Sequence, residues 1–441
     1  MDTLDNLHFC LREVFAFFHR EIAVRSWQEW LFFFMPFYVF GEFPHYVMPT
    51  LVLLAQKLVH PFAGRSHEEQ KEAFLATHPR ISVLLVGYNE EDAIANAIES
   101  LLELEYEGLD IVVVDDNSTD DMYRAAQPYA ERGLIRLFKN TAASGRAGRP
   151  TASNYALAVA EGDFILSVDA DTSFDRNTLL HMIGPFYDPA VGAVAGNLKV
   201  RNVGSGLVAR MQAIEYFISI GLWKRWLNLV GMNLQASGAF GAFRRQALQQ
   251  CGGWDPELAE DADVSLKIKR QGWSLVFEPY AIAMTNVPPT LTALSRQRYR
   301  WDRGMLRTYF HKHGSLLNFR TYNLRITAAM LLEYFFSVVL TFLYVFWLGY
   351  MLWRNPMILI FVYVVCYAVY TLSTGISVGV ALLFSERRDR EWPLLFAVPL
   401  FAPYKGYLRW VRLYALAMEV LQVNYEDSYL PQSAWRNTER W

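Results

Sequence analysis

Two long apolar runs in the C-terminal third constrain this chain more than any other feature. Residues 326–352 and 356–384 are apolar almost throughout and are separated by a short connection. A helix needs about 20 consecutive apolar residues to cross a bilayer whose hydrocarbon core is roughly 30 Å thick. Backbone polar groups cannot be left unpaired in hydrocarbon, so such a span folds as a helix. The two runs therefore predict a pair of transmembrane helices.

Three further segments are apolar enough to contact a membrane, and for two of them the sequence allows more than one arrangement in the membrane. Residues 31–58 are interrupted by Gly-Glu-Phe-Pro-His at 41–45, so they fit one kinked span, which is favoured, or a re-entrant hairpin. Residues 392–424 fit a last span with a basic cytosolic end or an interfacial helix. Residues 7–24 have the pattern of an amphipathic helix on the membrane surface.

Composition narrows the class of protein. Charged residues make up 19% of the chain, which is below the roughly 25% typical of soluble domains. The formal net charge of −3 gives no basic character, so nucleic acid is not expected as a partner. The cysteines, Cys10, Cys251 and Cys366, lie far apart and form neither a metal-ligand pattern nor a disulfide framework.

Between the apolar ends lies a stretch in which strand and helix patterns alternate. Short apolar runs predict buried strands, and residues with helical spacing lie between them. The predicted strands are 81–86, 111–114, 134–138 and 164–168, and the predicted helices are 91–104, 119–132 and 153–160. This alternation is typical of an α/β domain with a mostly parallel sheet, in which ligands bind at the carboxyl ends of the strands.

The chain is predicted to have four parts. Residues 1–60 hold the amphipathic segment and the first membrane region, and residues 61–320 form the α/β domain. Residues 321–424 hold the C-terminal transmembrane and interfacial helices, and residues 425–441 form a short tail. Clusters of arginine and lysine place the α/β domain in the cytosol by the positive-inside rule.

Carboxylates directly follow two of the predicted strands. Asp115 and Asp116 follow the strand 111–114, and Asp169 and Asp171 follow the strand 164–168. Carboxylate oxygens suit Mg²⁺, which completes its shell with phosphate oxygens and water. A carboxylate at a strand end can also accept a hydrogen bond from a nucleobase or a ribose. Each pair taken alone also fits a solvated turn or a helix cap.

A third acidic group lies at 257–263, with Glu260 and Asp261 at its centre. A hydroxyl that attacks a carbon atom needs a general base, and a carboxylate suits that role. The alternative is an acidic helix N-terminus, because residues 264–270 have helical character.

The fourth motif is the segment 295–301, SRQRYRW, which precedes the apolar runs. On a helix, Gln297, Arg300 and Trp301 share one face at spacings of three and four. This face offers an amide, a guanidinium that binds phosphate oxygens, and an indole that can stack on a sugar ring.

The rest of this segment is basic and is predicted to hold the helix at the membrane surface. Arg296, Tyr299 and Arg303 form the opposite face, and Arg298 is grouped with the arginines of this anchor. The segment is therefore expected to serve both a site and a membrane contact.

The four motifs occur in the order Asp-Asp, Asp-x-Asp, Glu-Asp and Gln-x-x-Arg-Trp, ahead of a C-terminal membrane region. In this the chain resembles the processive, membrane-integrated inverting glycosyltransferases of family 2, which include cellulose, chitin, hyaluronan and poly-N-acetylglucosamine synthases. The resemblance covers residues 80–305 by motif. It implies an α/β fold of the GT-A type, with a Rossmann-like mixed sheet, inserted between transmembrane helices and flanked by interfacial helices.

The resemblance also implies a role for each motif residue. Catalysis is assigned to Asp261, as general base, and to Glu260. Donor binding is assigned to Tyr88, Glu90, Asp115, Asp116, Arg149, Asp169, Gln297 and Arg300. The metal is assigned to Asp169 and Asp171, and the acceptor to Trp301, Phe240 and Gly241. Two positions depart from the family pattern, because Arg149 stands where lysine is usual and Ala259 where threonine is usual.

The implied activity is transfer of a sugar from a UDP-sugar, with Mg²⁺ or Mn²⁺, to a growing β-linked polymer. The resemblance also implies that the configuration at the anomeric carbon inverts and that the polymer is translocated across the membrane. The segments 191–197 and 212–216 look most like the bacterial poly-β-1,6-N-acetylglucosamine synthases, whereas Arg149 and the N-terminal region do not. The implied location is the plasma (inner) membrane, multi-pass, with the catalytic domain in the cytosol.

The implied partners are the UDP-sugar donor, a polysaccharide acceptor and the lipid bilayer, and the need for a small accessory membrane subunit stays open. Two other functions also stay open. One is transfer of a single sugar to a lipid, as in the ceramide glucosyltransferases, which share similar motifs. The other is a membrane scaffold without enzymatic activity.

Overall fold

The structure, a computed structural model, describes residues 12–13, 16, 19–59, 67–104, 106–140, 148–320, 322–354 and 356–421. The predicted tail 425–441 and much of the predicted amphipathic segment 7–24 lie outside the described residues.

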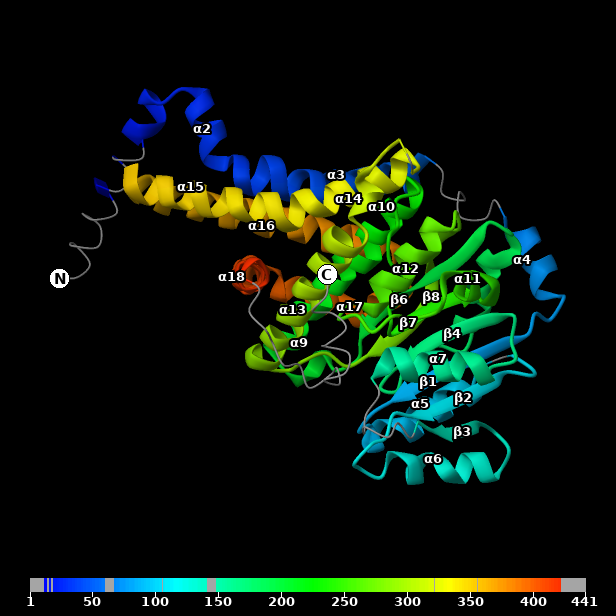
Figure 1. Ribbon diagram of the computed structural model, residues 1–441. Helices are drawn as coiled ribbons and strands as arrows, with labels where there is room; N and C mark the ends of the chain where they lie inside the picture. Colours follow the sequence, from blue (N-terminus) through cyan, green and yellow to red (C-terminus); the bar gives the residue numbers. More distant parts are fainter. Residues whose placement is uncertain are drawn as a thin grey trace.

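A mixed eight-stranded sheet forms the core of the α/β domain (Figure 1). Its spatial order is β3 (Arg136–Lys139), β2 (Asp110–Asp115), β1 (Ile81–Gly87), β4 (Phe164–Asp169), β7 (Phe240–Arg244), β6 (Val191–Val200), β8 (Ser274–Thr285) and β5 (Ser173–Phe174). The half from β3 to β4 is parallel, as the continuous apolar strands predicted. Strand β7 is antiparallel to both of its neighbours, and β5 is antiparallel to β8. Strands β6 and β8 pair in parallel, so the sheet is mixed and mostly parallel, as predicted.

Helices cover both faces of this sheet. Apolar residues of α5 (Glu91–Leu102), α6 (Met122–Glu131) and α8 (Thr178–Ile183) pack on one face. Those of α7 (Arg149–Val159), α11 (Arg245–Cys251) and α12 (Glu260–Arg270) pack on the other. Every strand and helix predicted for the α/β domain is present, with ends that differ by a few residues.

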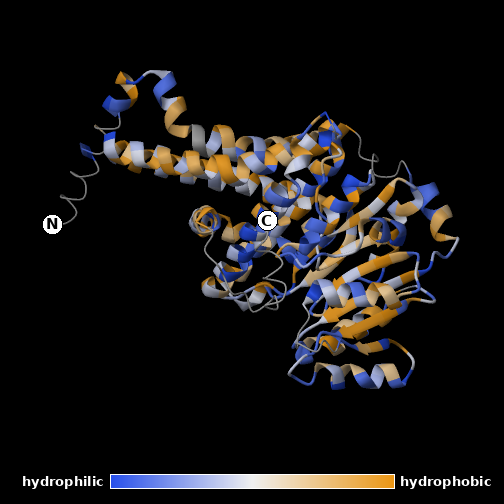
Figure 2. Cartoon of the chain, viewed as in Figure 1, coloured by the Kyte–Doolittle hydropathy of each residue, from blue (hydrophilic) through white to orange (hydrophobic). Residues whose placement is uncertain are grey.

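Long apolar helices extend away from the sheet (Figure 1) and are coloured largely as hydrophobic in Figure 2. One run comprises α14 (Leu324–Tyr334), the π-helical η8 (Phe335–Val339) and α15 (Leu340–Arg354), and the other is α16 (Pro356–Phe384). Among the described residues, these two runs are long and apolar enough to cross a membrane. They coincide with the two runs that the sequence predicted.

The described parts of the predicted segments 31–58 and 392–424 are also helical but are not among these two candidates. A continuous run of α2 (Trp27–Phe34), π-helical η1 (Met35–Val47) and α3 (Met48–Val59) replaces the alternative of a re-entrant hairpin. Near the C-terminus, α17 (Arg388–Glu391), the 3-10 helix η9 (Trp392–Leu400) and α18 (Phe401–Val420) follow α16. Helix α18 packs along α13 (Leu291–Leu306), which carries the fourth motif.

The apolar helices and the α/β domain share a core. Apolar residues of α9 (Leu207–Ile218) pack with residues of α3, α16, η9 and α18. Helix α10 (Lys224–Leu229) follows α9 through the π-helical η5 (Ser219–Trp223) and also lies at this junction. The shared core holds the carboxyl edge of the sheet close to the apolar helices.

Candidate active site

The carboxyl ends of three neighbouring parallel strands gather the predicted donor-binding carboxylates. Strand β1 lies between β2 and β4 in the sheet. The register pairs Gly87 with Asp115 and Val86 with Asp169, so the two aspartates flank the end of β1. Tyr88 follows β1 directly at this edge. The sheet order thus unites groups that lie far apart in the sequence.

Asp115 and Asp116 are both buried, and their contacts differ. Asp115 Oδ1 accepts a hydrogen bond from the backbone N–H of Ser118 at 2.8 Å, while its Oδ2 has no hydrogen-bond partner among the described residues. Asp116 accepts from the Asn140 side chain at 3.0 Å and from the Gly148 backbone N–H at 2.9 Å. Lys139 Nζ lies 3.9 Å from Asp115 Oδ2, beyond hydrogen-bond distance, so this oxygen is an acceptor that a ligand N–H or O–H group can use.

Glu90, Asp169 and Asp171 form an acidic cluster at the same edge. Burial, with the charges of Asp171 and Asp169, raises the pKa of Glu90 to about 7. Burial and the charge of Asp169 also raise the pKa of Asp171. Burial is the main cause of both shifts, and repulsion between the carboxylates adds to it. A divalent cation stabilises such a setting.

The donors of this cluster fit Mg²⁺ or Mn²⁺. The Asp171 carboxylate has distant hydroxyl contacts, 3.4 Å from Thr285 Oγ1 to each oxygen, and Asp169 pairs with Arg149. No group of three or more His, Cys, Asp or Glu side chains with metal-binding geometry occurs in the described part of the chain. Phosphate oxygens and water would therefore complete the shell, as Mg²⁺ prefers.

Arg149, the first residue of α7, joins the acidic cluster to the Glu-Asp motif. Its guanidinium pairs with Asp169 and lies 3.5 Å from Glu260 Oε1, and its Nη2 donates to the Gly238 carbonyl at 2.7 Å. A lysine would bring a single ammonium group, whereas the planar guanidinium of Arg149 contacts all three of these groups at once. The departure from the family pattern at this position thus has a structural use.

Asp261 lies in the first turn of α12 and is fixed by three donors. Its Oδ2 accepts from Gln235 Nε2 at 2.8 Å and from the Gly238 N–H at 3.0 Å. Its Oδ1 accepts from the Ala262 N–H at 2.8 Å. Helix α12 starts at Glu260, so the acidic motif is both a helix N-terminus and part of the site. A carboxylate held in this way is suited to accept a proton from a hydroxyl.

Two further titratable groups lie beside Asp261. Burial raises the pKa of Glu260 to about 7; Arg149 acts against this shift and Asp261 adds to it. Lys224, at the start of α10, donates to the Gln235 carbonyl at 3.4 Å. Burial lowers the pKa of Lys224 to about 8, against the charge of Asp261.

Helix α13 carries Gln297, Arg300 and Trp301, and Gly304 continues the same face at the next helical spacing. A Cβ atom on Gly304 would lie only 3.0 Å from the Ala259 Cβ atom, so α13 packs tightly on the residues before α12. This contact turns the predicted binding face toward the Glu-Asp motif. The small side chain of Ala259, where the family usually has threonine, suits the close approach.

The surroundings of Gln297 and Trp301 limit what this face can bind. Gln297 Oε1 is buried, and the described residues give it no hydrogen-bond partner. The Arg298 guanidinium lies over the Trp301 ring, 4.5 Å from its centre. One face of the indole is thus occupied by a cation, and at most one is open to a sugar ring.

The predicted membrane anchor on α13 is largely wrong. Arg298 forms an ion pair with Glu215 at 2.8 Å, and the buried Arg303 pairs with Glu419 at 2.8 Å. Arg296 is exposed. The two paired arginines join α13 to α9 and α18 and do not reach lipid headgroups.

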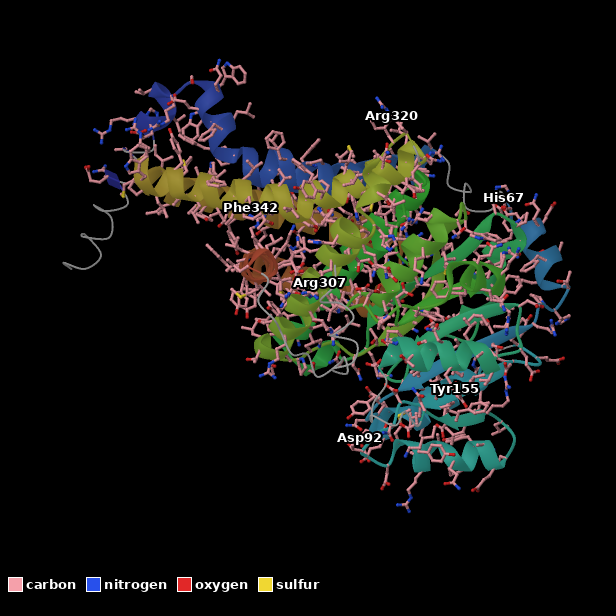
Figure 3. The ribbon with its side chains drawn as sticks, in the orientation of Figure 1. His67, Asp92, Tyr155, Arg307, Arg320 and Phe342 are labelled. Atoms are coloured by element: carbon pink, nitrogen blue, oxygen red, sulfur yellow. The ribbon has the colours of Figure 1, made fainter. Side chains whose placement is uncertain are left out.

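The reason is that α18 covers the face predicted to meet lipid. Tyr299 is buried, with its ring centre 5.5 Å from that of Tyr414. Arg307, labelled in Figure 3, donates to Glu419 at 2.6 Å, and Arg412 pairs with Asp302 at 2.9 Å. The chain segments that meet in this seam are far apart in sequence, so helical spacing alone gave no sign of it.

The acceptor residues predicted on β7 lie inside the sheet. Phe240 is fully buried, and its ring centre lies 5.6 Å from that of Phe174. Gly241 pairs with Ser167 of β4. The Phe240 ring therefore offers no surface to an acceptor here. The loop before β7 contacts the site through Gly238 instead.

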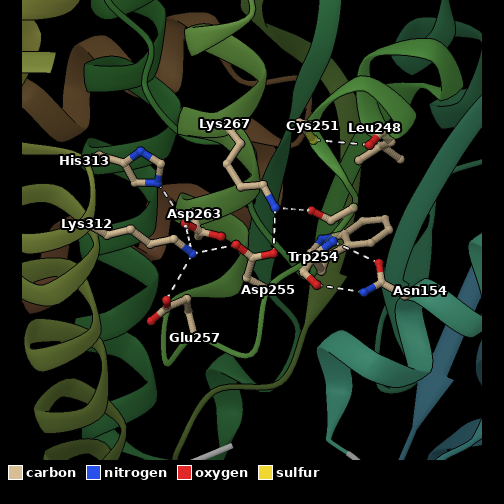
Figure 4. Close-up of polar contacts among 11 residues, drawn as sticks. Asn154, Leu248, Cys251, Trp254, Asp255, Glu257, Asp263, Lys267, Lys312 and His313 are labelled. Carbon is tan, nitrogen blue, oxygen red and sulfur yellow. Dashed lines mark hydrogen bonds and ion pairs between the residues drawn. The ribbon is translucent and has the colours of Figure 1, made fainter. Parts of the chain in front are cut away.

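A largely buried network of charged side chains contacts α12 on the side of η6 (Figure 4). Lys312, at the end of the π-helical η6 (Arg307–Lys312), lies near three carboxylates. They are Asp255 at 2.7 Å, Glu257 at 3.0 Å and Asp263 at 2.9 Å. His313 Nε2 also lies 2.8 Å from Asp263. The network ties the helix that carries Asp261 to the end of the α13–η6 run.

Three residues near the site were not predicted from the sequence. Asn140 follows β3, so the rule that ligands meet strand ends could have found it. Gln235 and Lys224 have no such signal, because they reach Asp261 only through tertiary packing.

Comparison with known proteins identifies the family. The pattern of the family described as "Glycosyltransferase like family 2" matches residues 78–304, about half of the chain, and this stretch includes all four motifs. The chain belongs to this family of glycosyltransferases, and it is an enzyme.

Curated relatives are similar over the same part of the chain. The poly-beta-1,6-N-acetyl-D-glucosamine synthase of Staphylococcus aureus (strain MSSA476) is 34% identical over 239 residues, which are 52% of this chain and 56% of that protein. The enzyme of the same name from Staphylococcus epidermidis is 34% identical over 226 residues, 51% of this chain and 54% of that protein. The chain thus spans about half the length of the curated relatives it matches.

A solved structure is similar over more of the chain. The mannosyltransferase PcManGT from Pyrobaculum calidifontis, in complex with GDP-Man and Mn²⁺, aligns with a TM-score of 0.54 and 19% identity. The alignment covers 85% of this chain and all of that one. At this identity the likeness shows the fold alone, and it confirms the predicted α/β fold of the GT-A type.

Proposed function

We propose that this glycosyltransferase is a membrane polysaccharide synthase that transfers a sugar from a UDP-sugar to the end of a growing β-linked polymer. The observation that carries the proposal is the fixed carboxylate of Asp261, which Gly238 and Arg149 link to the donor edge at Asp169. Similarity to the staphylococcal synthases supports a polymer product and makes UDP-N-acetylglucosamine the first donor to test.

In this mechanism Asp261 accepts the proton of the acceptor hydroxyl as the oxygen attacks the anomeric carbon. Attack from the side opposite the diphosphate inverts the configuration, so an α-linked donor gives a β-linked product. A single displacement needs no second nucleophile.

The charge that develops on the leaving diphosphate requires cationic partners. Arg300 on α13 is assigned to this role, and Arg149 pairs with Asp169, one of the predicted metal ligands. A divalent metal held by Asp169 and Asp171 would supply further charge neutralisation when bound. Tyr88, Glu90, Asp115 and Asp116 are assigned to the nucleotide at the strand ends.

The membrane role is part of the same proposal. The run α14–α15 and the helix α16 cross the plasma (inner) membrane, and the domain 61–320 lies in the cytosol. The growing polymer passes between these helices to the far side. A small accessory subunit, if required, is a membrane protein that binds the same helices.

The proposal is tested by measuring UDP release from the purified full-length protein in detergent, across a panel of UDP-sugars with Mg²⁺ or Mn²⁺. We expect one donor to be hydrolysed or transferred far faster than the others, and a high polymer or an oligomer ladder as product. Asp169→Ala and Arg300→Ala should abolish the signal while leaving the melting temperature nearly unchanged.

Two results would contradict parts of the proposal. A product that carries one sugar on a lipid would replace the polymer synthase with a lipid glycosyltransferase. Unchanged turnover in Asp169→Ala or Arg300→Ala would overturn the assignment of the donor site.

A further inference from the structure

A cavity of about 270 Å³ lies where the end of α16 meets the α/β domain. This volume is near the lower end of the roughly 300–1,000 Å³ typical of small-molecule sites. Its lining comes from β6, α9, η5, α10 and the connection from α16 to η9. No step of the proposed reaction uses it.

Cationic side chains dominate the polar lining. They are Lys199, Arg201, Arg225, Arg387 and Arg390. Lys199 pairs with Glu391 at 2.5 Å, and Arg387 pairs with Asp175. For the other three arginines, no described carboxylate lies at ion-pair distance. The lining therefore holds five cations and one carboxylate, Glu391. The carboxylates that act on the remaining arginines, Asp171 on Arg201 and Glu278 and Glu386 on Arg225, lie beyond ion-pair distance.

Arg225 gives the clearest sign of a missing ligand. Its Nε is buried and has no hydrogen-bond partner in the described part of the chain. Its guanidinium lies 5.6 Å from the Tyr280 ring centre and 5.2 Å from that of Phe384. Lys57 Nζ lies 4.5 Å from the centre of the same Phe384 ring, so two positive charges lie close together at this end of the cavity. A buried, unpaired donor in a cationic corner is unfavourable until an anion supplies an acceptor.

The other part of the lining is apolar and adjoins a surface suited to a membrane interface. Phe217, Ala381 and Leu394 line the cavity. The adjoining η9 exposes Trp392 and Phe396, with 50% and 76% of their surfaces accessible. Exposed aromatic residues at the end of a transmembrane helix are typical of the headgroup level of a bilayer.

From this geometry we infer that the cavity binds a phosphate group, and that an anionic phospholipid headgroup is its source. Arginine forks bind phosphate oxygens through paired hydrogen bonds. The apolar wall then lies beside the glycerol and the start of the acyl chains. The phosphate site stands on its own geometry, whereas the lipid source rests on the membrane location proposed above.

A bound headgroup would also touch the catalytic loop. Arg201 lines the cavity, and its Nη2 donates to the Asp171 carbonyl at 2.8 Å. Arg387 pairs with Asp175, four residues after Asp171. An anion that binds these arginines therefore sits next to the loop that carries the predicted metal ligands.

The test compares lipid binding to the full-length protein in detergent by native mass spectrometry. Phosphatidylglycerol and phosphatidylcholine are offered at equal concentration, with and without inorganic phosphate as competitor. Arg225→Gln and Arg390→Gln remove cations of the lining. Arg388→Gln is the matched control, because Arg388 is exposed on the same short helix α17 and does not line the cavity.

We expect the wild type and Arg388→Gln to prefer phosphatidylglycerol. Each lining variant should bind it about tenfold more weakly, a change of about 1.4 kcal/mol. If phosphatidylglycerol does not bind but inorganic phosphate raises the melting temperature of the wild type and not of Arg225→Gln, the ligand is a free phosphate.

Equal binding of the two lipids together with no effect of phosphate would overturn the inference. So would unchanged binding in both lining variants. UDP release is measured on the same samples, so a failure of the proposed reaction is seen separately from a failure of this site. Arg390 is exposed, so its variant keeps the test valid if Arg225→Gln does not fold.

Discussion

Two adjacent carboxylates in the site have different surroundings. Asp261 receives three hydrogen bonds, two of them from the loop before β7. Glu260 is largely buried, and its pKa is raised to about 7 chiefly by that burial. Neighbouring acids whose environments differ in this way can take different roles in proton transfer. We assign proton acceptance to Asp261 and a supporting, ionisable contact with Arg149 to Glu260.

Asp261→Asn should remove most of the turnover. Asparagine keeps the shape of the side chain but cannot accept the proton, and general-base catalysis is typically worth about 10²–10⁴-fold. Single-turnover UDP release with the preferred donor measures this loss. Glu107→Gln, a change to an exposed carboxylate in the turn before β2, is the control and should be fully active. Equal rates in the two variants would rule out Asp261 as the base.

Glu260 predicts a pH dependence of stability. Its pKa in the folded protein lies above the ordinary value of 4.5, so the folded state binds its proton more tightly than the unfolded state. Its contribution to stability is therefore greatest below that ordinary value and falls as the pH rises toward about 7. Glu260→Gln removes this loss, which is on the order of 2–3 kcal/mol.

Thermal unfolding without metal or donor measures the effect. The melting temperature of Glu260→Gln relative to the wild type should be higher at pH 8 than at pH 5. A difference that stays constant between these pH values would show that Glu260 does not titrate in this range.

At the scale of elements, the site depends on how α12 and α13 are held together. Gly304 of α13 packs on Ala259, just before α12. Behind them, Lys312 links η6 to three carboxylates of the α12 region. Burial lowers the pKa of Lys312, but the charges and hydrogen bonds of Asp263, Asp255 and Glu257 outweigh it and raise the pKa overall. The lysine is therefore charged, and it offsets the repulsion among the three carboxylates.

Lys312→Met should destabilise the protein by about 3–5 kcal/mol, because it leaves the buried Glu257 and Asp263 without this cation. Asp255 is less affected, because its side chain is 37% exposed and keeps its ion pair with Lys267. Combining it with Asp263→Asn removes one of those carboxylates and should recover part of the loss. Thermal unfolding of the wild type, the two single variants and the double variant forms the cycle. Strictly additive effects would mean that the two side chains do not interact.

At the scale of the whole molecule, the apolar helices have one end at the α/β domain and the other end far from it. The run α14–α15 leaves the α/β domain, and α16 returns to it, where Arg387 pairs with Asp175 (Figure 1). The end of α15 at Arg354 and the start of α16 at Pro356 therefore lie far from the sheet. If these helices cross the membrane, these two helix ends and the α/β domain lie on opposite sides.

Cysteine labelling of intact cells tests this arrangement in a variant that lacks the native cysteines. Trp353→Cys, at the exposed end of α15, should react with a membrane-impermeant maleimide. Ser205→Cys, on the exposed surface of the α/β domain, should react only after the cells are permeabilised. Labelling of both positions in intact cells would contradict a cytosolic catalytic domain.

The local elements and the chemistry at the strand ends follow from the sequence alone. Continuous apolar runs predicted the parallel strands, and Asp115 and Asp169 were expected at an edge because ligands meet the carboxyl ends of such strands. The two apolar runs predicted the two long helices, because length and hydropathy are properties of a segment alone.

Which of these groups meet, and which element covers each face, depends on the tertiary structure. Gln235, Lys224 and Arg149 reach the catalytic carboxylates from separate elements. Arg303 became a buried partner of Glu419 because α18 packs on α13. The cationic cavity at the end of α16 is assembled from four parts of the chain. Helical or strand spacing fixes a side chain's direction within its own element, whereas its partners depend on long-range packing.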